Sequence, residues 1–146
     1  MTNSAKKQIN VGIIGCGKIS QAYFDSGKKF ALLNIAACAD LEESIAQSKA
    51  AENNCKALLI TELLNDPDIS LVINLTIPSA HAAVNRDILD AGKHLYCEKP
   101  LTVDLEDALK VLTLAESKNL LVGCAPDTFF LAQACKLVAR LSTPAD

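Results

Sequence analysis

Three glycines lie close together near the start of the chain, in the segment 11–20 (VGIIGCGKIS). Gly15 and Gly17 directly follow an apolar run that is typical of a buried strand, and a helix pattern follows them. Because glycine lacks a Cβ, a phosphate can approach the backbone there, and the first N–H groups of a helix attract an anion. We therefore predict a pyrophosphate-binding turn in which Gly15 makes the bend, Gly17 gives access, and Lys18 and Ile19 begin the helix. A purely structural glycine turn is the alternative.

Two further residues extend this pattern. Ser20 stands where a dinucleotide-binding turn usually has Gly or Ala, and serine is small enough for close packing of helix on strand. Asp40 follows the second apolar run, at the distance expected of an acid that hydrogen-bonds the adenosine ribose hydroxyls. A carboxylate there repels a 2′-phosphate, and no arginine follows it, so the sequence favours NAD over NADP. Asp40 can also cap the next helix, and the two roles can coexist.

A proline and a histidine follow the fourth apolar run (LVINLT), in the segment 76–81 (TIPSAH). Pro78 lacks an amide hydrogen and biases Ile77 toward an extended conformation. We therefore expect Thr76, Ile77 and Pro78 to run along the bound cofactor. His81 falls in the first turn of the next predicted helix, near the same site. Both a structural role and direct catalysis remain open for a lone histidine.

Glu98, Lys99 and Pro100 follow the fifth apolar run. Pro100 keeps Lys99 out of helical geometry, and the bond between them is a candidate cis peptide. Lys99 can then project into a cleft, hydrogen-bond a substrate hydroxyl or carbonyl, and pass a proton as the candidate catalytic residue. A surface ion pair between Glu98 and Lys99 is the alternative.

Strand and helix patterns alternate along the chain, which predicts an α/β fold with a doubly wound parallel sheet. Crossovers in such sheets are right-handed, and the favoured arrangement is a Rossmann fold of six parallel strands in the order 3-2-1-4-5-6. Ligands then bind beyond the carboxyl ends of the strands, where all the motifs above lie. The expected strands are 9–14, 34–39, 57–60, 71–76, 94–97 and 120–124, and the expected helices are 18–26, 41–52, 62–64, 80–91, 104–117 and 129–141.

The composition narrows the class of protein. The net charge of −3 and the scattered Lys and Arg residues argue against a nucleic-acid partner. No apolar run is long enough for a membrane span, and no secretory signal is evident, so we expect a soluble cytoplasmic protein. The 6 cysteines form no CxxC pair and only 2 histidines accompany them, which argues against a zinc site. We expect reduced, buried thiols.

Together these motifs resemble the Gfo/Idh/MocA family of oxidoreductases. The resemblance rests on VGIIGCGKIS, Asp40, NLTIPSAHAAV and above all CEKPLT, and it covers the chain from about residue 11 to 138; GCAPDTFF at 123–130 looks like the sugar-active members. It implies that NAD or NADP binds and that a hydride moves between nicotinamide and a carbon bearing a hydroxyl or carbonyl. The substrate would be a sugar, inositol or related polyol. It also implies that Lys99 belongs to the active site, that Glu98 lies near the nicotinamide ribose, and that Thr76–Pro78 and His81 line the cofactor site.

Family members continue into a second α+β domain, which supplies most substrate contacts and usually the oligomer interface. The chain ends at Asp146, so we expect residues 1–146 to be the dinucleotide-binding domain, inactive alone, of a protein that is a homo-oligomer at full length. Two alternatives are a non-catalytic dinucleotide-binding module and another nucleotide user, such as a methyltransferase or CoA-binding domain. Neither a methyltransferase nor a CoA-binding domain needs a lysine where Lys99 stands.

Overall fold

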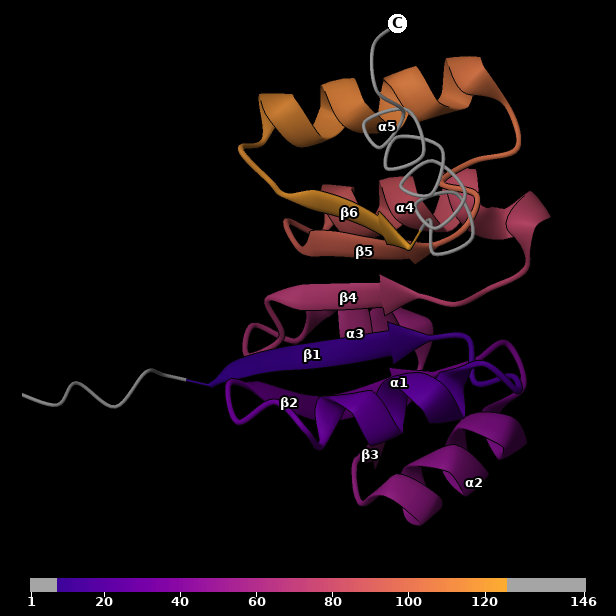
Figure 1. Cartoon of the computed structure of the whole chain (residues 1–146), viewed down its shortest axis with the longest axis vertical. Helices are drawn as coiled ribbons and strands as arrows, with labels where there is room; N and C mark the ends of the chain where they lie inside the picture. The colour runs from indigo at the N-terminus through magenta and orange to yellow at the C-terminus, as the bar shows by residue number, and fades with distance from the viewer. Residues whose placement is uncertain (1–7, 126–146) are drawn as a thin grey trace, which may run out of the picture.

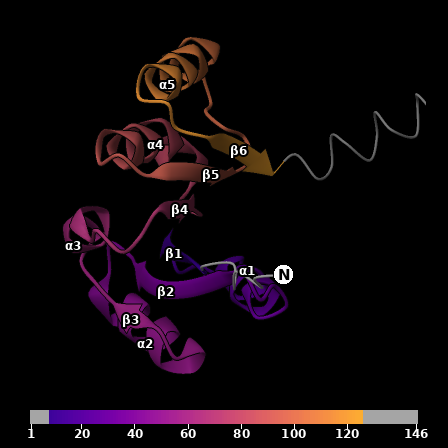
Figure 2. The same ribbon diagram turned by 90° about the vertical axis from the view of Figure 1, so that its left-hand side faces the viewer.

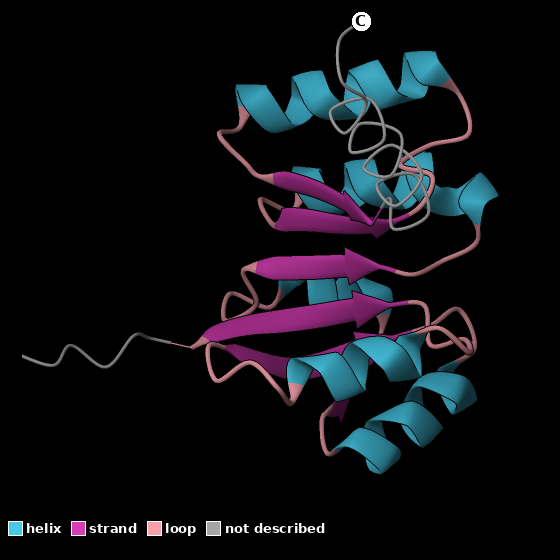
Figure 3. Ribbon diagram, viewed as in Figure 1, coloured by secondary structure: helices cyan, strands magenta, loops and turns pink. Residues whose placement is uncertain are grey.

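Six parallel strands form the centre of the computed structural model, which describes residues 8–125 (Figure 1). Every ladder is parallel, and the strand order is β3-β2-β1-β4-β5-β6, which confirms the predicted doubly wound sheet. The strands are β1 (Ile9–Ile14), β2 (Leu33–Ala39), β3 (Lys56–Ala57), β4 (Leu71–Asn74), β5 (His94–Glu98) and β6 (Val122–Ala125). All carboxyl ends therefore meet at one edge of the sheet (Figure 3).

Helices cover the sheet on both faces, as the alternating pattern predicts (Figure 2). They are α1 (Ser20–Gly27), α2 (Glu43–Asn53), α3 (Ile60–Asn65), α4 (His81–Asp90) and α5 (Leu105–Ser117), and a short 3-10 turn, η1 (Pro78–Ala80), precedes α4. One buried cluster joins the sheet to α1 and α2, and a second joins it to α3, α4 and α5. The neighbours Ile13 and Ile14 belong to different clusters because successive strand residues point to opposite faces.

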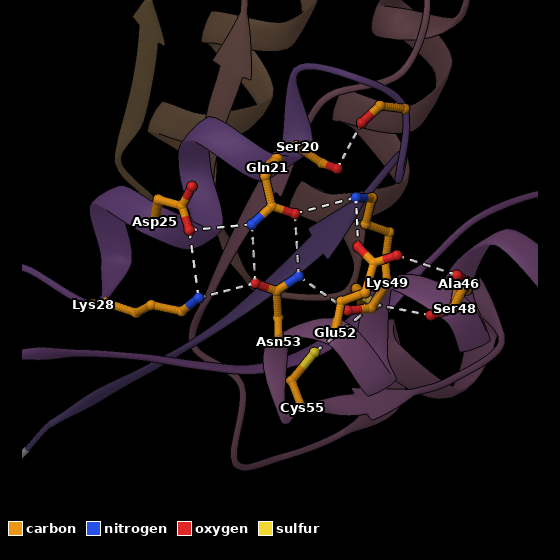
Figure 4. Close-up of polar contacts among 12 residues, drawn as sticks. Ser20, Gln21, Asp25, Lys28, Ala46, Ser48, Lys49, Glu52, Asn53 and Cys55 are labelled. Carbon is orange, nitrogen blue, oxygen red and sulfur yellow. Dashed lines mark hydrogen bonds and ion pairs between the residues drawn. The ribbon is translucent and has the colours of Figure 1, made fainter.

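The first two helices are also tied to each other at the surface (Figure 4). The Gln21 side chain of α1 donates to Asn53 of α2 at 3.2 Å, and Lys49 of α2 donates to Gln21 at 3.1 Å. Lys28 reaches the same Asn53 oxygen at 3.1 Å. These contacts hold α2 beside the helix that begins at the glycine turn.

Most element boundaries differ from the sequence expectation by one or two residues. For example, α1 begins at Ser20 with Ile19 as its N-cap, so Lys18 and Ile19 precede the helix instead of beginning it. Differences at two further places have a local cause. The third strand spans only Lys56–Ala57, and Ile60 begins α3 instead of ending a strand. The Glu62 carboxylate accepts from the backbone N–H of Leu59 at 3.0 Å, so it caps that helix and draws the start of α3 forward. The fourth strand ends at Asn74, because the Asn74 side chain accepts from Thr76 and turns the chain. The predicted helix 129–141 and Cys135 lie outside the described residues.

Candidate functional site

The glycine turn joins β1 to α1 at the carboxyl edge of the sheet, beside the end of β4. Gly15 has a φ of +98°, and a Cβ on it would stand 2.6 Å from the carbonyl carbon of Leu75. Only glycine fits there without displacing backbone. A Cβ on Gly17, by contrast, would meet nothing within 4 Å. Gly15 is thus required by the fold itself, whereas Gly17 leaves open space above the turn.

The start of α1 presents unused donors to that space. Gly17, Lys18 and Ile19 are exposed, and within residues 8–125 their backbone N–H groups have no hydrogen-bond acceptor. Ser20 is fully buried, and its hydroxyl donates to the Gly17 carbonyl at 2.7 Å, which closes the turn. Free N–H groups at a helix N-terminus beside a residue without a Cβ are the features that receive a phosphate. The residues present fit a dinucleotide pyrophosphate.

Asp40 follows β2 and reaches across to the glycine turn. One carboxylate oxygen accepts from the Cys16 backbone N–H at 2.7 Å, and the other accepts from the Glu42 N–H at 3.1 Å. The N-cap of α2 is Glu42, so Asp40 shapes the turn before that helix without capping it. Each oxygen keeps lone-pair capacity for a further donor. The carboxylate is therefore held at the turn, where it can accept from ribose hydroxyls.

The segment after β4 lies over the same edge. Thr76 donates to the Asn74 side-chain oxygen from both its backbone N–H, at 3.1 Å, and its hydroxyl, at 2.7 Å. Ile77 is extended and 68% exposed, and Pro78 begins η1. Ile77 is therefore extended, as predicted, and it exposes an apolar side chain at this edge of the sheet.

His81 is buried at the start of α4, with 1% of its surface exposed. Its Nε2 lies 3.0 Å from the Thr76 carbonyl oxygen, and its Nδ1 lies 2.5 Å from the Pro100 carbonyl oxygen. The ring therefore joins the segment after β4 to the segment after β5. Its contacts are with the protein interior, which favours the structural role over direct catalysis.

The segment after β5 carries the predicted lysine. The Lys99–Pro100 peptide is cis, and both residues are exposed. Glu98 accepts from the Tyr23 hydroxyl of α1 at 2.6 Å and from the Lys99 backbone N–H at 3.1 Å. Across the described residues the Lys99 ammonium makes no ion pair, so the simple pairing of Glu98 with Lys99 does not occur. The Lys99 side chain is available to a ligand.

Three residues that the sequence did not single out help to build this site: Tyr23, Asn74 and Asn85. Asn74 and Asn85 are fully buried between the sheet and α4, and the Asn74 amide donates to the Asn85 side-chain oxygen at 2.8 Å. The signal that could have found them is a polar amide inside an apolar strand and another on the apolar face of a helix. Such residues require partners, because an unpaired buried amide is costly. No comparable sequence pattern marks Tyr23 as part of the site.

The cysteines divide between buried and half-buried positions. Cys16, Cys38 and Cys97 are buried, Cys55 and Cys124 are intermediate, and all five are free thiols. The hydrogen bond with Cys38 lowers the pKa of Cys16, the cysteine in the glycine turn. Burial raises the pKa of Cys97 to about 12. Within residues 8–125 no group of three His, Cys, Asp or Glu side chains could hold a metal ion.

The fold and the strand-end residues together define an NAD(P)-binding domain of the Rossmann type. The sequence profile of the family described as "Oxidoreductase family, NAD-binding Rossmann fold" (Gfo/Idh/MocA) matches residues 9–125. The chain belongs to this oxidoreductase family. In the described part of the chain, no helix combines the length and apolar character of a membrane span.

Two of the relatives that the chain resembles are named for a sugar and an inositol substrate. The dTDP-3,4-didehydro-2,6-dideoxy-alpha-D-glucose 3-reductase of Saccharopolyspora spinosa is 32% identical over 119 residues, covering 80% of this chain and 36% of that protein. The inositol 2-dehydrogenase/D-chiro-inositol 3-dehydrogenase of Lacticaseibacillus casei is 29% identical over 119 residues, covering 77% of this chain and 34% of that protein. The chain spans between 25% and 36% of the first curated relatives it matches.

A solved structure shows the same fold with a cofactor. KijD10, a 3-ketoreductase from Actinomadura kijaniata in complex with NADP and TDP-benzene, superposes with a TM-score of 0.78 at 25% identity. The match covers 89% of this chain and 42% of that one.

Proposed function

We propose that the chain is the cofactor-binding part of an NAD-dependent dehydrogenase or reductase that acts on a hydroxyl or carbonyl carbon of a sugar, inositol or related polyol. The observation that carries this proposal is the exposed Lys99, free of ion pairs within residues 8–125, at the same sheet edge as the open glycine turn. The sugar and inositol substrates of the relatives support the substrate class. The relatives have longer chains than this one, and the activity that we propose is that of the whole protein.

The residues at this edge of the sheet have distinct parts in the proposed function. The free N–H groups of Gly17, Lys18 and Ile19 bind the pyrophosphate, and Asp40 accepts from the adenosine ribose hydroxyls. When bound, the nicotinamide supplies or accepts the hydride. Lys99 holds the substrate oxygen through its Nζ and moves a proton to or from that oxygen as the carbon changes oxidation state.

Asp40 supports NAD as the cofactor over NADP. Its carboxylate is fixed by two backbone N–H groups, so it cannot turn away from a 2′-phosphate without giving up both hydrogen bonds. The residues that follow are Leu41, Glu42 and Glu43, which bring further negative charge and no cation. KijD10 binds NADP, so the preference is a property we assign to this chain from its own residues.

Binding of the dinucleotide tests the first part of the proposal. We expect NADH to raise the melting temperature of the chain, since a ligand that binds only the folded state stabilises it. Absence of any shift with NADH or NADPH at about 1 mM, a concentration well above an ordinary dissociation constant for these cofactors, would contradict the proposal.

Substitution of Lys99 in the whole protein tests the second part of the proposal, the proton transfer. We expect Lys99→Met to lower kcat by about 10²-fold or more, the usual contribution of a positioned proton donor, while the dissociation constant of NADH changes little. Lys18→Met is a matched control that removes an exposed lysine at the same edge, and it should act on cofactor binding more than on kcat. Equal losses of kcat and of NADH affinity in Lys99→Met would remove Lys99 from the chemistry.

A further inference from the structure

Two buried asparagines connect the ends of β4 and β5 through α4. Asn85 accepts from the Asn74 amide at 2.8 Å and donates to the Leu101 carbonyl oxygen at 2.9 Å. Asn74 in turn accepts from the Thr76 hydroxyl at 2.7 Å. Hydrogen bonds therefore run without interruption from the segment after β4, through the interior, to the segment after β5.

His81 makes a second, independent connection between the same two segments. Its ring nitrogens face the carbonyl oxygens of Thr76 and Pro100. Thr76 is thus held on one side by Asn74 and on the other by His81, and the chain around Lys99 is held at Pro100 and Leu101. We call Asn74, His81 and Asn85 the polar bracket.

The polar bracket stands in an otherwise apolar interior. Val72, Ile88, Leu89 and Leu95 surround the same layer between the sheet and α4, and each is buried. Buried amides and imidazoles are retained at a cost unless every group is paired, and in the described residues no buried side-chain nitrogen or oxygen lacks a partner. Apolar side chains would fill this layer at lower desolvation cost, so packing alone does not account for three polar residues here.

The polar bracket itself is shielded from any ligand. Asn74 and Asn85 are 0% exposed and His81 is 1% exposed, so all three can act on a ligand only through the segments that they hold. In a doubly wound sheet each βαβαβ half receives one mononucleotide. The segments after β4 and β5 belong to the second half, opposite the glycine turn and Asp40.

We propose that Asn74, His81 and Asn85 are positioning residues that fix the segments 76–78 and 98–100 in the arrangement that receives the nicotinamide half of the dinucleotide. The inference rests on the proposed function, because it assumes that a nicotinamide dinucleotide binds at this edge. It assigns recognition of the two halves of the cofactor to different parts of the chain: main-chain N–H groups and Asp40 for the ADP half, and the segments held by the polar bracket for the nicotinamide half.

The experiment compares two ligands on the full chain. NADH occupies both halves of the site, whereas ADP-ribose lacks the nicotinamide ring and depends more on the first half. Asn85→Ala removes the amide and leaves the Leu101 carbonyl and the Asn74 amide without their partner. We expect the NADH affinity to fall about tenfold and the ADP-ribose affinity to fall less than twofold, measured by calorimetry well below the melting temperature.

Matched variants separate positioning from general destabilisation. Val111→Ala truncates a buried side chain of the same half that has no hydrogen-bonding group, and we expect a lower melting temperature with both affinities unchanged. Asn85→Ser, which leaves a hydroxyl and room for a water molecule, serves if Asn85→Ala does not fold. His81→Leu should reproduce the selective loss of NADH affinity, and His81→Gln, which keeps an N–H donor, should recover part of it.

Several outcomes would overturn the inference. Parallel losses of NADH and ADP-ribose affinity, or NADH affinity unchanged in every folded variant, would show that the polar bracket does not position the nicotinamide half. Failure of all these variants to fold would show that the three residues serve stability instead. A wild-type chain that binds neither ligand would instead reject the proposed function.

Discussion

The two halves of the sheet present their strand ends to the same edge but hold them by different means. In the β1–β3 half, the contacts that hold the turn involve the main chain. Gly15 at φ +98° packs against the Leu75 backbone, and the Asp40 carboxylate accepts from main-chain N–H groups. In the β4–β6 half, buried side chains join segments that lie far apart in the sequence, as Asn85 does with Leu101 and His81 with Pro100.

This difference predicts how each half responds to substitution. A turn fixed by backbone conformation tolerates almost no change at the residue whose φ it requires. A network of side-chain hydrogen bonds loses one contact at a time and can be weakened by degrees. We therefore expect one substitution in the first half to cause a large loss of stability, and single substitutions in the second half to cause smaller losses.

The largest effect is expected at Gly15. Gly15→Ala places a methyl group 2.6 Å from the Leu75 carbonyl carbon in a backbone conformation that alanine rarely adopts. We expect the free energy of unfolding to fall by about 3 kcal/mol, from strained φ and overpacking together, as measured by urea denaturation.

Gly17→Ala is the matched control, because nothing lies within 4 Å of the position that its Cβ would take. We expect a stability within about 0.5 kcal/mol of the wild type, the usual range for a surface substitution. NADH affinity should nevertheless fall markedly, because the methyl group occupies the space assigned to the pyrophosphate. A variant that loses stability and keeps its NADH affinity would reverse our assignment of the two glycines.

An intermediate effect is expected at Asp40. We expect the wild-type chain to bind NADH more tightly than NADPH, and Asp40→Asn to reduce the ratio of the two affinities about tenfold, since a charge-assisted hydrogen bond to ribose contributes about 1.5–3 kcal/mol. Titration of both cofactors against both proteins measures this ratio. Asn34→Asp, which adds a carboxylate near the opposite edge of the sheet, should leave the ratio unchanged. An equal ratio in wild type and Asp40→Asn would show that Asp40 does not select the cofactor.

The smallest effect concerns one buried thiol in each half. A hydrogen bond with Cys16 raises the pKa of Cys38 from 9.0 to about 12, and burial raises that of Cys97 from 9.0 to about 12. Both thiols stay protonated at pH 8, so we expect iodoacetamide to label them only after unfolding, as read by mass spectrometry.

The same shifts set a dependence of stability on pH. As the pH rises, these thiols ionise in the unfolded chain, near pH 9, before they ionise in the folded chain, near pH 12. Their contribution to the free energy of unfolding is therefore fully present below about pH 9 and is lost as the pH rises toward 12. Urea denaturation at pH 8 and pH 10 should show this loss, and Cys97→Ala should make it shallower. Rapid labelling of Cys97 in the folded chain would contradict the burial argument.

The sequence predicted the fold and the glycine turn because both depend on local signals. Alternating strand and helix patterns fix the order of the elements, and the handedness of the crossovers then limits the topology to few choices. The glycines and Asp40 are readable because a turn conformation and a strand-end carboxylate are properties of short segments. The third strand was predicted too long, since it is held by only the register pairs Ala37–Lys56 and Cys38–Ala57.

The amino-acid sequence by itself thus determined the parallel sheet, the edge at which its strand ends meet, and the polar and glycine residues at that edge that could bind a ligand or react. Only the tertiary structure decided which of these residues are exposed at that edge and which are buried and hold others in place. His81 turned inward to two carbonyl groups, Tyr23 reached Glu98 from another element, and Asn74 found Asn85. The physical reason is that hydrogen bonds between side chains distant in sequence depend on how helices pack on the sheet, and no local pattern specifies that packing.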